Sequence, residues 1–460
     1  MIPSARTRRL IRTTLIAAAT LLCGCATYHP LPLGKGEGTP SATQLSVPAS
    51  AMPVPELATH RFDPTDGLDV TEAAMLAVAN TPDLKVQRDG LGVARAQAFA
   101  AGLLPDPQLS FGEDLPHGGD GNGVVRAYNL GIAEDVSSLL LRSSHRHAAN
   151  AQAEQVNLDL LWAEWQTVAQ ARLLFGQVQG LRAQQAELDA EQQALAPVDR
   201  AVQAALRTGN LDYDGASAGL NAMADARRQA SDNAMALHQA ESDLRQLLGL
   251  APTAPLDLVG APYRTDPDAA QLQAALADLP QRRPDLLALR AGYRAQEATL
   301  RGTILAQFPA ITLGLNRARD TSNITTNGFS INLSLPLFDR NRGNIAIETA
   351  TRQQLKDDYE ARLLATRTDM QRLADDLRTL DARQQSQAEH AQQLDAARDA
   401  AQQAWQKGLI DWPTYLSIRA NALAADTDLI ALRQSRSATA IALEALLGRT
   451  DFVMQRTSKR

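Results

Sequence analysis

The chain has 460 residues, of which 4% are aromatic, 21% are charged and only two are cysteine. From Leu139 onward, alanine, glutamine, leucine, arginine and aspartate dominate, and this balance favours long helices over a thick globular core. The formal net charge is -6, and no basic patch of the kind that binds nucleic acid is present.

The first residues have the pattern of a secretory signal that ends in a lipid attachment site. Four arginines precede an apolar stretch from Thr13 to Leu22, which is too short to span a bilayer. The run Leu22-Cys23-Gly24-Cys25 resembles a lipobox, in which residues 1–24 are removed and Cys25 becomes the acylated first residue. A plain signal peptide with incidental cysteines is the alternative. The two cysteines make a poor metal site, because no histidine or acidic side chain follows before His29.

The rest of the chain presents one pattern twice, which predicts an internal duplication. Three motifs recur in the same order at nearly constant spacing: Pro82-Asp83-Leu84 with Pro284-Asp285-Leu286, Gly209-Asn210-Leu211-Asp212 with Gly408-Leu409-Ile410-Asp411, and Leu247-Leu248-Gly249 with Leu446-Leu447-Gly448. The predicted division is a signal at 1–24, a lipid-anchored extended tether at 25–67, a first repeat at 68–250, a linker at 251–268, a second repeat at 269–449 and a tail at 450–460.

Each repeat is predicted to consist of helices around one hairpin. The opening helices are expected at Val70–Gly102 and Ala269–Ala306, each followed by prolines that end it. After the hairpin comes a long helix, Val136–Leu206 in the first repeat and Arg340–Lys407 in the second, and a shorter helix returns after a glycine. Leu363, Met370 and Leu377 recur every seven residues in the second long helix, which predicts a coiled-coil seam.

Residues between these helices alternate with period two, which predicts strands. In the second repeat the apolar members are Ile311, Leu313, Phe329 and Ile331, and the polar members include Thr312, Ser330 and Asn332. A polar loop at 317–327 separates the two strands, and 116–123 is its counterpart in the first repeat. We expect the apolar and the polar side chains to lie on opposite faces. The family resemblance described below implies that the apolar face meets lipid, and a soluble, half-buried hairpin is the alternative.

The predicted lengths imply that one chain is part of a larger wall. About 70 helical residues rise roughly 105 Å, nearly the length of two shorter helices placed end to end. A long helix should therefore lie beside a pair of short ones. Four strands cannot close a barrel, and an open sheet edge is not tolerated in lipid, so several chains must share one barrel.

Residues 68–448 resemble the TolC-like outer-membrane factors, also called outer membrane efflux proteins, of the lipoprotein type. The resemblance rests on the lipobox, the paired motifs, the hairpins and the run Leu335-Pro336-Leu337-Phe338-Asp339-Arg340-Asn341-Arg342-Gly343-Asn344. It implies a mainly α fold with a small membrane β-barrel portion, in which three copies form a periplasmic α-barrel and a twelve-stranded barrel. It also implies a periplasmic adaptor protein and an RND-type inner-membrane pump as partners.

The resemblance places the two glycine turns at a tip that docks the adaptor. The residues assigned to this tip are Gly209, Leu211, Asp212, Gly408, Ile410 and Asp411. Glycine permits the positive φ that ends one helix before the next begins, and both aspartates are suited to cap the returning helices. Some family members carry a ring of aspartates three and six residues beyond the position of Asp411. Thr414 and Ser417 stand there in this chain, which argues against an acidic gate.

The expected function is a passive duct in the cell outer membrane for drugs or other small molecules, with no cofactor and no bound metal. Heavy-metal cation efflux and type I secretion are the alternatives, and a periplasmic adaptor or structural coiled-coil lipoprotein is the distant one. Catalysis is not expected, since nucleophile motifs, HExxH and glycine-rich phosphate loops are absent from the sequence. His145 and His147 point to different faces of a helix, which favours solvated side chains over a metal site.

Overall fold

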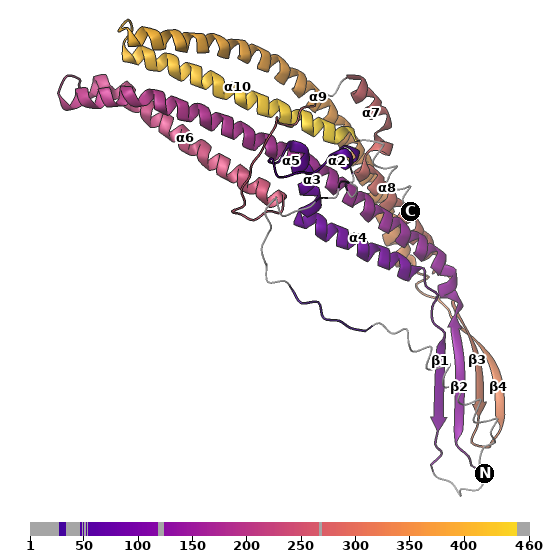
Figure 1. The fold of residues 1–460 in the computed structure, drawn as a ribbon. Helices are drawn as coiled ribbons and strands as arrows, with labels where there is room; N and C mark the ends of the chain where they lie inside the picture. Colours follow the sequence, from indigo (N-terminus) through magenta and orange to yellow (C-terminus); the bar gives the residue numbers. More distant parts are fainter. Residues whose placement is uncertain are drawn as a thin grey trace. The chain divides into compact units, whose positions relative to one another are not determined.

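The computed structural model describes residues 27–33, 47, 49, 52, 54–117, 124–265 and 269–448. Residues 1–39 and 40–460 form two separate compact units. In the first unit, residues 27–33 have no regular secondary structure, and the predicted lipid attachment site at Cys25 lies outside the described residues. All helices and strands below belong to the second unit (Figure 1).

Within this unit, the order of two short helices, a hairpin, a long helix and a returning helix occurs twice (Figure 1). After α2 (Pro55–Thr59), the first round comprises α3 (Val70–Asn80), α4 (Pro82–Ala101), β1 (Gln108–Asp114), β2 (Ala127–Asp135), α5 (Val136–Arg207) and α6 (Tyr213–Leu247). The second comprises α7 (Ala269–Arg282), α8 (Pro284–Leu305), β3 (Ala310–Arg319), β4 (Thr325–Ser334), α9 (Arg342–Gln406) and α10 (Trp412–Leu447). The predicted mainly helical, internally duplicated fold with four strands is confirmed.

A proline divides each opening helix, which the sequence predicted as one continuous element. Pro82 and Pro284 are the first residues of α4 and α8. Thr81 and Arg283 before them have ψ values of 122° and 123°, outside the helical region. A proline ring clashes with a helical conformation of the preceding residue, so the chain bends there. The prediction of single opening helices was therefore wrong, and each Pro-Asp-Leu motif marks the start of a second helix.

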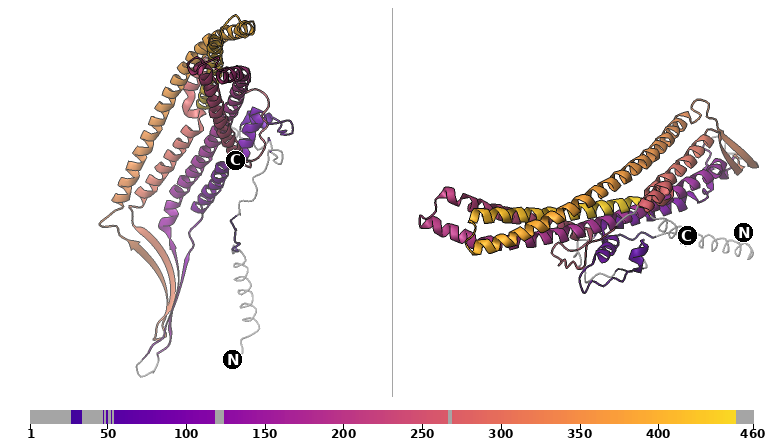
Figure 2. Two further views of the ribbon diagram at one scale, coloured as in Figure 1. Left: turned by 90° about the vertical axis from the view of Figure 1, so that its left-hand side faces the viewer. Right: turned by 90° about the horizontal axis from the view of Figure 1, so that it is seen from above.

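The long helices organise the packing. Helix α5 contacts α3, α4 and α6 of its own round and α8 and α10 of the other, whereas α9 contacts α8 and α10. Each long helix thus lies beside two shorter ones, as the lengths predicted (Figures 1 and 2). Met370 and Leu377 of the predicted seam are buried, with Leu363 half-buried beside them. Among the described residues, no helix is long and apolar enough to cross a membrane.

The two returning helices end in equivalent contacts. Gly249 and Gly448 have φ values of 66° and 61°. A Cβ atom on Gly249 would lie 2.8 Å from the carbonyl oxygen of Asn80, and one on Gly448 would lie 2.9 Å from that of Arg282. Asn80 and Arg282 each stand two positions before a helix-starting proline. Each Leu-Leu-Gly end therefore packs against the break between its own opening helices, where only glycine fits.

The segment predicted as an extended tether reaches the core before it ends. Leu57 of α2 and Val54 just before it are buried in one cluster with α3, α5 and the end of α6. Glu56 forms an ion pair with Arg172 of α5, with 3.2 Å between Oε2 and Nη2. The prediction of an extended tether was therefore wrong for residues 54–59, because burial of their apolar side chains favours a packed helix there.

The four strands form one antiparallel sheet in the order β1-β2-β3-β4. Leu109 pairs with Ile132, Ile132 pairs with Leu315, and Leu315 pairs with Phe329. The two hairpins therefore lie side by side, joined through β2 and β3.

The hairpin loop of the second repeat is shorter than predicted. Strand β3 continues to Arg319 and β4 begins at Thr325, so the loop lies inside the predicted range of 317–327. Arg317 pairs with Asn327 within the ladder. Their polarity suggested a loop, but backbone pairing does not depend on the side chain, and the strands extend beyond the apolar residues.

Candidate functional site

One face of the sheet carries an apolar area that crosses all four strands and is bordered by polar residues such as Glu134 and Arg317. Paired residues share a face because side chains alternate along each strand. Leu109, Ile132, Leu315 and Phe329 form one row on this face, and between 47% and 74% of each residue is exposed. The same register places these further apolar residues on it: Phe111, Leu130, Ile311, Leu313, Ile331 and Leu333. An exposed apolar surface of this extent marks a contact with lipid or protein.

The opposite face carries small and polar side chains. Thr312, Ser330 and Asn332 lie there, so the segregation predicted from period two is confirmed. Polar side chains also cover glycines of the neighbouring strand on this face. A Cβ atom on Gly314 would lie 2.5 Å from the Ser330 hydroxyl, and one on Gly131 would lie 2.7 Å from the hydroxyl of Ser110. The sheet thus separates an apolar surface from a polar one.

The outer edges of the sheet are open. Strands β1 and β4 each have a strand partner on one side only within the described part of the chain. Every residue of β1 and nearly every residue of β4 is exposed. Unpaired N–H and C=O groups along such an edge are ready to pair with another strand.

The glycine turns at the opposite ends of the long helices have the backbone geometry that was predicted. The φ values of Gly209 and Gly408 are 71° and 68°, a region that residues with side chains rarely adopt. Apart from the adjoining residues, no described heavy atom lies within 4 Å of a Cβ built on either glycine. Leu211 and Ile410, which follow these turns, are half-buried.

Asp212 and Asp411 cap the returning helices, as their positions predicted. The Asp212 carboxylate accepts a hydrogen bond from the Gly215 N–H at 2.7 Å, and Asp411 accepts one from the Thr414 N–H at 3.0 Å. Hydrogen bonds from the Thr414 side chain and backbone hold the pKa of the Asp411 carboxyl below its usual value. Both carboxylates therefore satisfy N–H groups that a helix start leaves free.

Aromatic residues of the second repeat pack the region between the two turns. The rings of Trp405 and Tyr415 stack, with centroids 5.0 Å apart and planes at 11°. Trp412 of α10 lies against Gly219 of α6, where a Cβ would come within 2.9 Å of its ring. The second returning helix thus contacts the first through a position that must remain small.

A buried ion pair that the sequence analysis missed joins the two repeats in the same region. Arg419 of α10 donates from Nε to Glu191 of α5 at 3.2 Å, and its Nη2 bonds the other carboxylate oxygen. Its Nη1 donates to the Tyr415 hydroxyl at 3.3 Å. Glu191 and Arg419 are 228 residues apart. The one local signal is an arginine in a row of buried residues, between Tyr415 and Ala422.

We expect Arg419→Met to destabilise this region by about 3–5 kcal/mol, because it leaves the buried Glu191 carboxylate without its partner. Hydrogen exchange of α10 amides around Tyr415 should then accelerate by roughly a hundredfold to several thousandfold, the range that corresponds to such an energy. Adding Glu191→Leu should restore most of the protection, since no charge is then left buried. Unchanged exchange in the single variant would show that the ion pair does not hold α10.

The other positions considered from the sequence lie on helix surfaces. His145 and His147 are exposed on α5, and Thr414 and Ser417 are exposed on α10. Among the residues with described placement, no three His, Cys, Asp or Glu side chains are grouped so that they could hold a metal. The two histidines stand two residues apart on one helix, so their side chains leave it in different directions.

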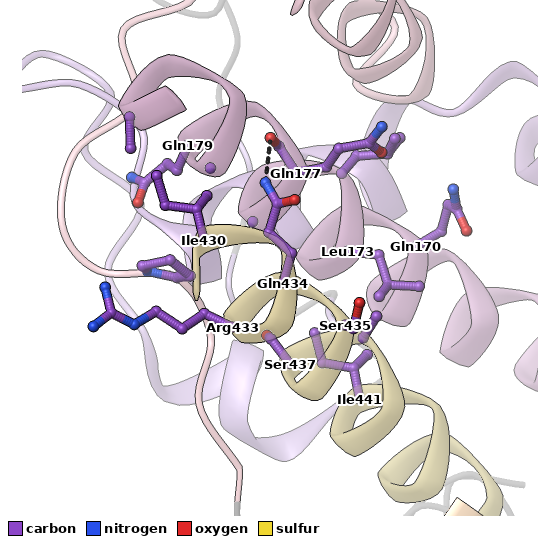
Figure 3. A pocket seen from close by; sticks show the side chains of 16 residues that line it. Gln170, Leu173, Gln177, Gln179, Ile430, Arg433, Gln434, Ser435, Ser437 and Ile441 are labelled. Atoms are coloured by element: carbon purple, nitrogen blue, oxygen red, sulfur yellow. Dashed lines mark hydrogen bonds between the residues drawn. The ribbon is translucent and has the colours of Figure 1, made fainter. Parts of the chain in front are cut away.

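A cavity of about 620 Å³ lies at the seam of the two repeats, between α5 and α10 (Figure 3). Leu173 and Ile441 give it apolar walls, and Gln177 and Gln434 contribute amides. The Gln434 side chain lies over Gly180, where a Cβ would fall 1.7 Å from its Nε2. That nitrogen donates to the Gln177 carbonyl at 3.5 Å. The missing side chain at Gly180 therefore makes room for a contact between the repeats.

A buried arginine cluster fixes the start of α8. Arg283 donates to Asp285 from Nε at 2.9 Å and from Nη2 at 2.7 Å, and Arg362 of α9 donates to the same carboxylate at 2.9 Å. The Arg283 guanidinium also lies over the ring of Trp162, 4.7 Å from its centroid. Burial alone would raise the pKa of the Asp285 carboxyl. The hydrogen bonds and charges of the two arginines outweigh it and hold that pKa below its usual value.

Residues 275–449, most of the second repeat, match the family model described as outer membrane efflux protein. Over these residues the chain is similar to that family. Among curated protein sequences, none matches this chain. The resemblance that the motifs predicted is confirmed over most of the second repeat.

Solved outer-membrane channels share the fold of this chain. The CmeC outer membrane channel of Campylobacter jejuni has a TM-score of 0.72 at 12% identity, over 94% of this chain and 98% of that one. The outer-membrane channel OprN has a TM-score of 0.70 at 16% identity, over 92% of this chain and 99% of that one. CusC has a TM-score of 0.68 at 20% identity, over 87% of this chain and 97% of that one. At these identities the likeness establishes the fold, from the sheet to the glycine turns.

Proposed function

We propose that this protein is the outer-membrane duct of a tripartite efflux system, in which three copies form a passive channel for drugs or other small molecules. The observation that carries the proposal is the continuity between sheet and helices. Strands β1, β2, β3 and β4 adjoin α4, α5, α8 and α9 in the chain, and these helices pack side by side in the same order. A sheet with one apolar and one polar face suits a wall between lipid and water.

The open edges support a barrel shared by several copies, for which we propose three. In lipid each unpaired backbone group costs several kcal/mol, so β4 of one copy must pair with β1 of the next. Three four-stranded sheets supply twelve strands, and barrel diameter grows with strand number. In the helical part, α4 and α9 are the two outermost helices of the row α4, α5, α8, α9. Val86 and Val93 on α4 are 70% and 58% exposed, which provides an apolar surface for a neighbouring copy.

The conductance of the purified protein tests the duct. In planar bilayers we expect discrete current steps of uniform size, because each inserted trimer opens one water-filled path. Heat-unfolded protein at the same concentration serves as the control. Protein that floats with vesicles but never conducts would contradict a duct.

The same proposal assigns the glycine turns to adaptor docking in the periplasm. Gly209 and Gly408 would shape the two turns, with Leu211, Asp212, Ile410 and Asp411 as the other members of this tip. Tyr213 and Leu409 beside them are 79% and 72% exposed, so each turn offers a large side chain to a partner. The inner-membrane pump would be reached through the adaptor.

Lipid attachment at Cys25 is the proposed anchor, and we expect Cys25→Ser to abolish incorporation of labelled palmitate. Only Cys25 follows the leucine-x-glycine pattern of a lipobox, so Cys23→Ser is the matched control and should remain labelled. Metabolic labelling followed by purification measures both variants. Palmitate that persists in Cys25→Ser would rule out this attachment site.

The proposed cargo can be separated from its alternatives in a deletion strain. Loss of a drug duct should sensitise cells to several unrelated small molecules. Sensitivity confined to heavy-metal cations would show that the cargo is metal cations and not drugs. Selective loss of one secreted protein from the medium would show that the chain serves type I secretion.

A further inference from the structure

The loop Leu335–Arg342, which joins β4 to α9, is held in an unusual conformation. Arg340 and Asn341 have φ values of 50° and 56°, in the left-handed region that residues with side chains seldom adopt. The Asn341 side chain donates to the Thr303 carbonyl of α8 at 2.8 Å and accepts a hydrogen bond from Asn344 at 2.7 Å. The loop therefore has one fixed shape, maintained against backbone strain.

This shape presents apolar side chains next to a free cation. Phe338 is 91% exposed, and Leu335 and Leu337 are 61% and 66% exposed. The Arg342 guanidinium folds back onto the carbonyl oxygens of the loop, with 3.2 Å from Nη2 to that of Phe338. Arg340 is also exposed, and within the described part of the chain it has no hydrogen-bond or ion-pair partner. Of the two arginines, one holds the loop and the other is available.

The loop lies where the apolar face of the sheet meets the helices. It begins directly after Ser334, the last residue of β4, and Ser334 pairs with Ala310, the first residue of β3. The other connections at this end of the sheet and the helix ends beside them also expose large apolar residues, namely Phe99, Leu103, Leu104, Leu140, Leu305 and Phe308. In the first repeat, β2 ends at Asp135 and α5 begins at Val136, so no equivalent loop stands there.

We propose that Leu335–Arg342 is a phospholipid-contact site of the periplasmic leaflet, at which Phe338 enters the boundary between headgroups and acyl chains and Arg340 binds the phosphate of an anionic lipid. The inference rests on the proposed function, which places the sheet in the outer membrane. Phe and Leu side chains of membrane-surface segments enter the boundary between headgroups and acyl chains, and a guanidinium matches the geometry of phosphate oxygens. Two arginines against Asp339 give the loop a net positive charge, complementary to an anionic headgroup.

The test uses the full-length protein reconstituted into phosphatidylcholine vesicles that contain a trace of spin-labelled lipid. Electron paramagnetic resonance separates lipids held at the protein surface from mobile ones. Because one arginine near the headgroups shifts the local partition of an anionic lipid severalfold, we expect labelled phosphatidylglycerol to be preferred over labelled phosphatidylcholine by about twofold on average over all surface lipids. Arg340→Gln should bring this ratio close to one, and Arg340→Lys should retain most of it.

Two controls separate the site from general effects. Arg207→Gln removes the same charge from an exposed position at the end of α5 and should leave the ratio unchanged. Phe338→Ala should lower the preference. Inorganic phosphate added to wild-type protein should leave the preference intact, as expected for a site that binds lipid. Wild-type protein without lipid preference, or Arg340→Gln with the full preference, would overturn the inference. Protein that holds no surface lipid in any vesicle would instead contradict the proposed membrane location.

Discussion

Asp285→Asn is expected to lower the free energy of unfolding by about 3–5 kcal/mol, because it leaves Arg283 buried without its counter-ion. Arg283 is fully buried and donates twice to this carboxylate, and Arg362 donates to it from α9. A neutral amide cannot balance both guanidinium charges. Thermal or chemical unfolding of the detergent-solubilised protein, followed by helical circular dichroism, measures the loss.

The duplication supplies a matched control for this prediction. Asp83 occupies the equivalent place in the first Pro-Asp-Leu motif but is exposed, so Asp83→Asn should change the stability little. The effect of Asp285→Asn should also depend on pH. The folded-state pKa of Asp285 is depressed, so its ionised form contributes stability that is fully present above about pH 4 and is lost as the pH falls through that lower pKa. Equal stability of both variants and wild type at neutral pH would contradict the cluster's role.

Valine at Gly209 or Gly408 is expected to abolish drug resistance while the amount of outer-membrane trimer stays normal. Both glycines have positive φ, so valine imposes a local strain of about 1–3 kcal/mol. No described atom beyond the adjoining residues crowds either position, and the strain should change the shape of the exposed turn rather than the packing. Minimum inhibitory concentrations and native gels of membrane extracts measure the two quantities.

Gly249 and Gly448 are the controls, because they share the positive φ but are packed. A Cβ on either would lie within 2.9 Å of a carbonyl oxygen, so valine there should lower the amount of trimer itself. Normal resistance in the double variant Gly209→Val/Gly408→Val would remove the turns from the docking model.

Features that repeat locally could be predicted from the sequence. Period-two alternation located the strands and their two faces, because neighbouring side chains on a strand point to opposite sides. The glycine-to-aspartate spacing located the turns at Gly209 and Gly408, whose positive φ and capping aspartates are present. The long helices α5 and α9 begin and end within two residues of their predicted bounds.

Features that depend on distant residues could not be predicted from the sequence. Helix-forming residues continue on both sides of Pro82 and Pro284, so the break is set by a single residue and by the Leu-Leu-Gly end that packs against it. The short helix around Leu57 gains its stability from α3 and α5, not from its own sequence. Arg419 and Glu191 meet only once α5 and α10 lie side by side.

The central claim is that several copies share one barrel, because the four-stranded sheet and the row of four helices in each chain leave open edges. The subunit number of the purified protein tests this claim most directly. Native mass spectrometry in mild detergent measures it without labels. We predict a single species of three copies, stable at dilution. A folded monomer as the single species would contradict the shared barrel and, with it, the proposed duct of three copies.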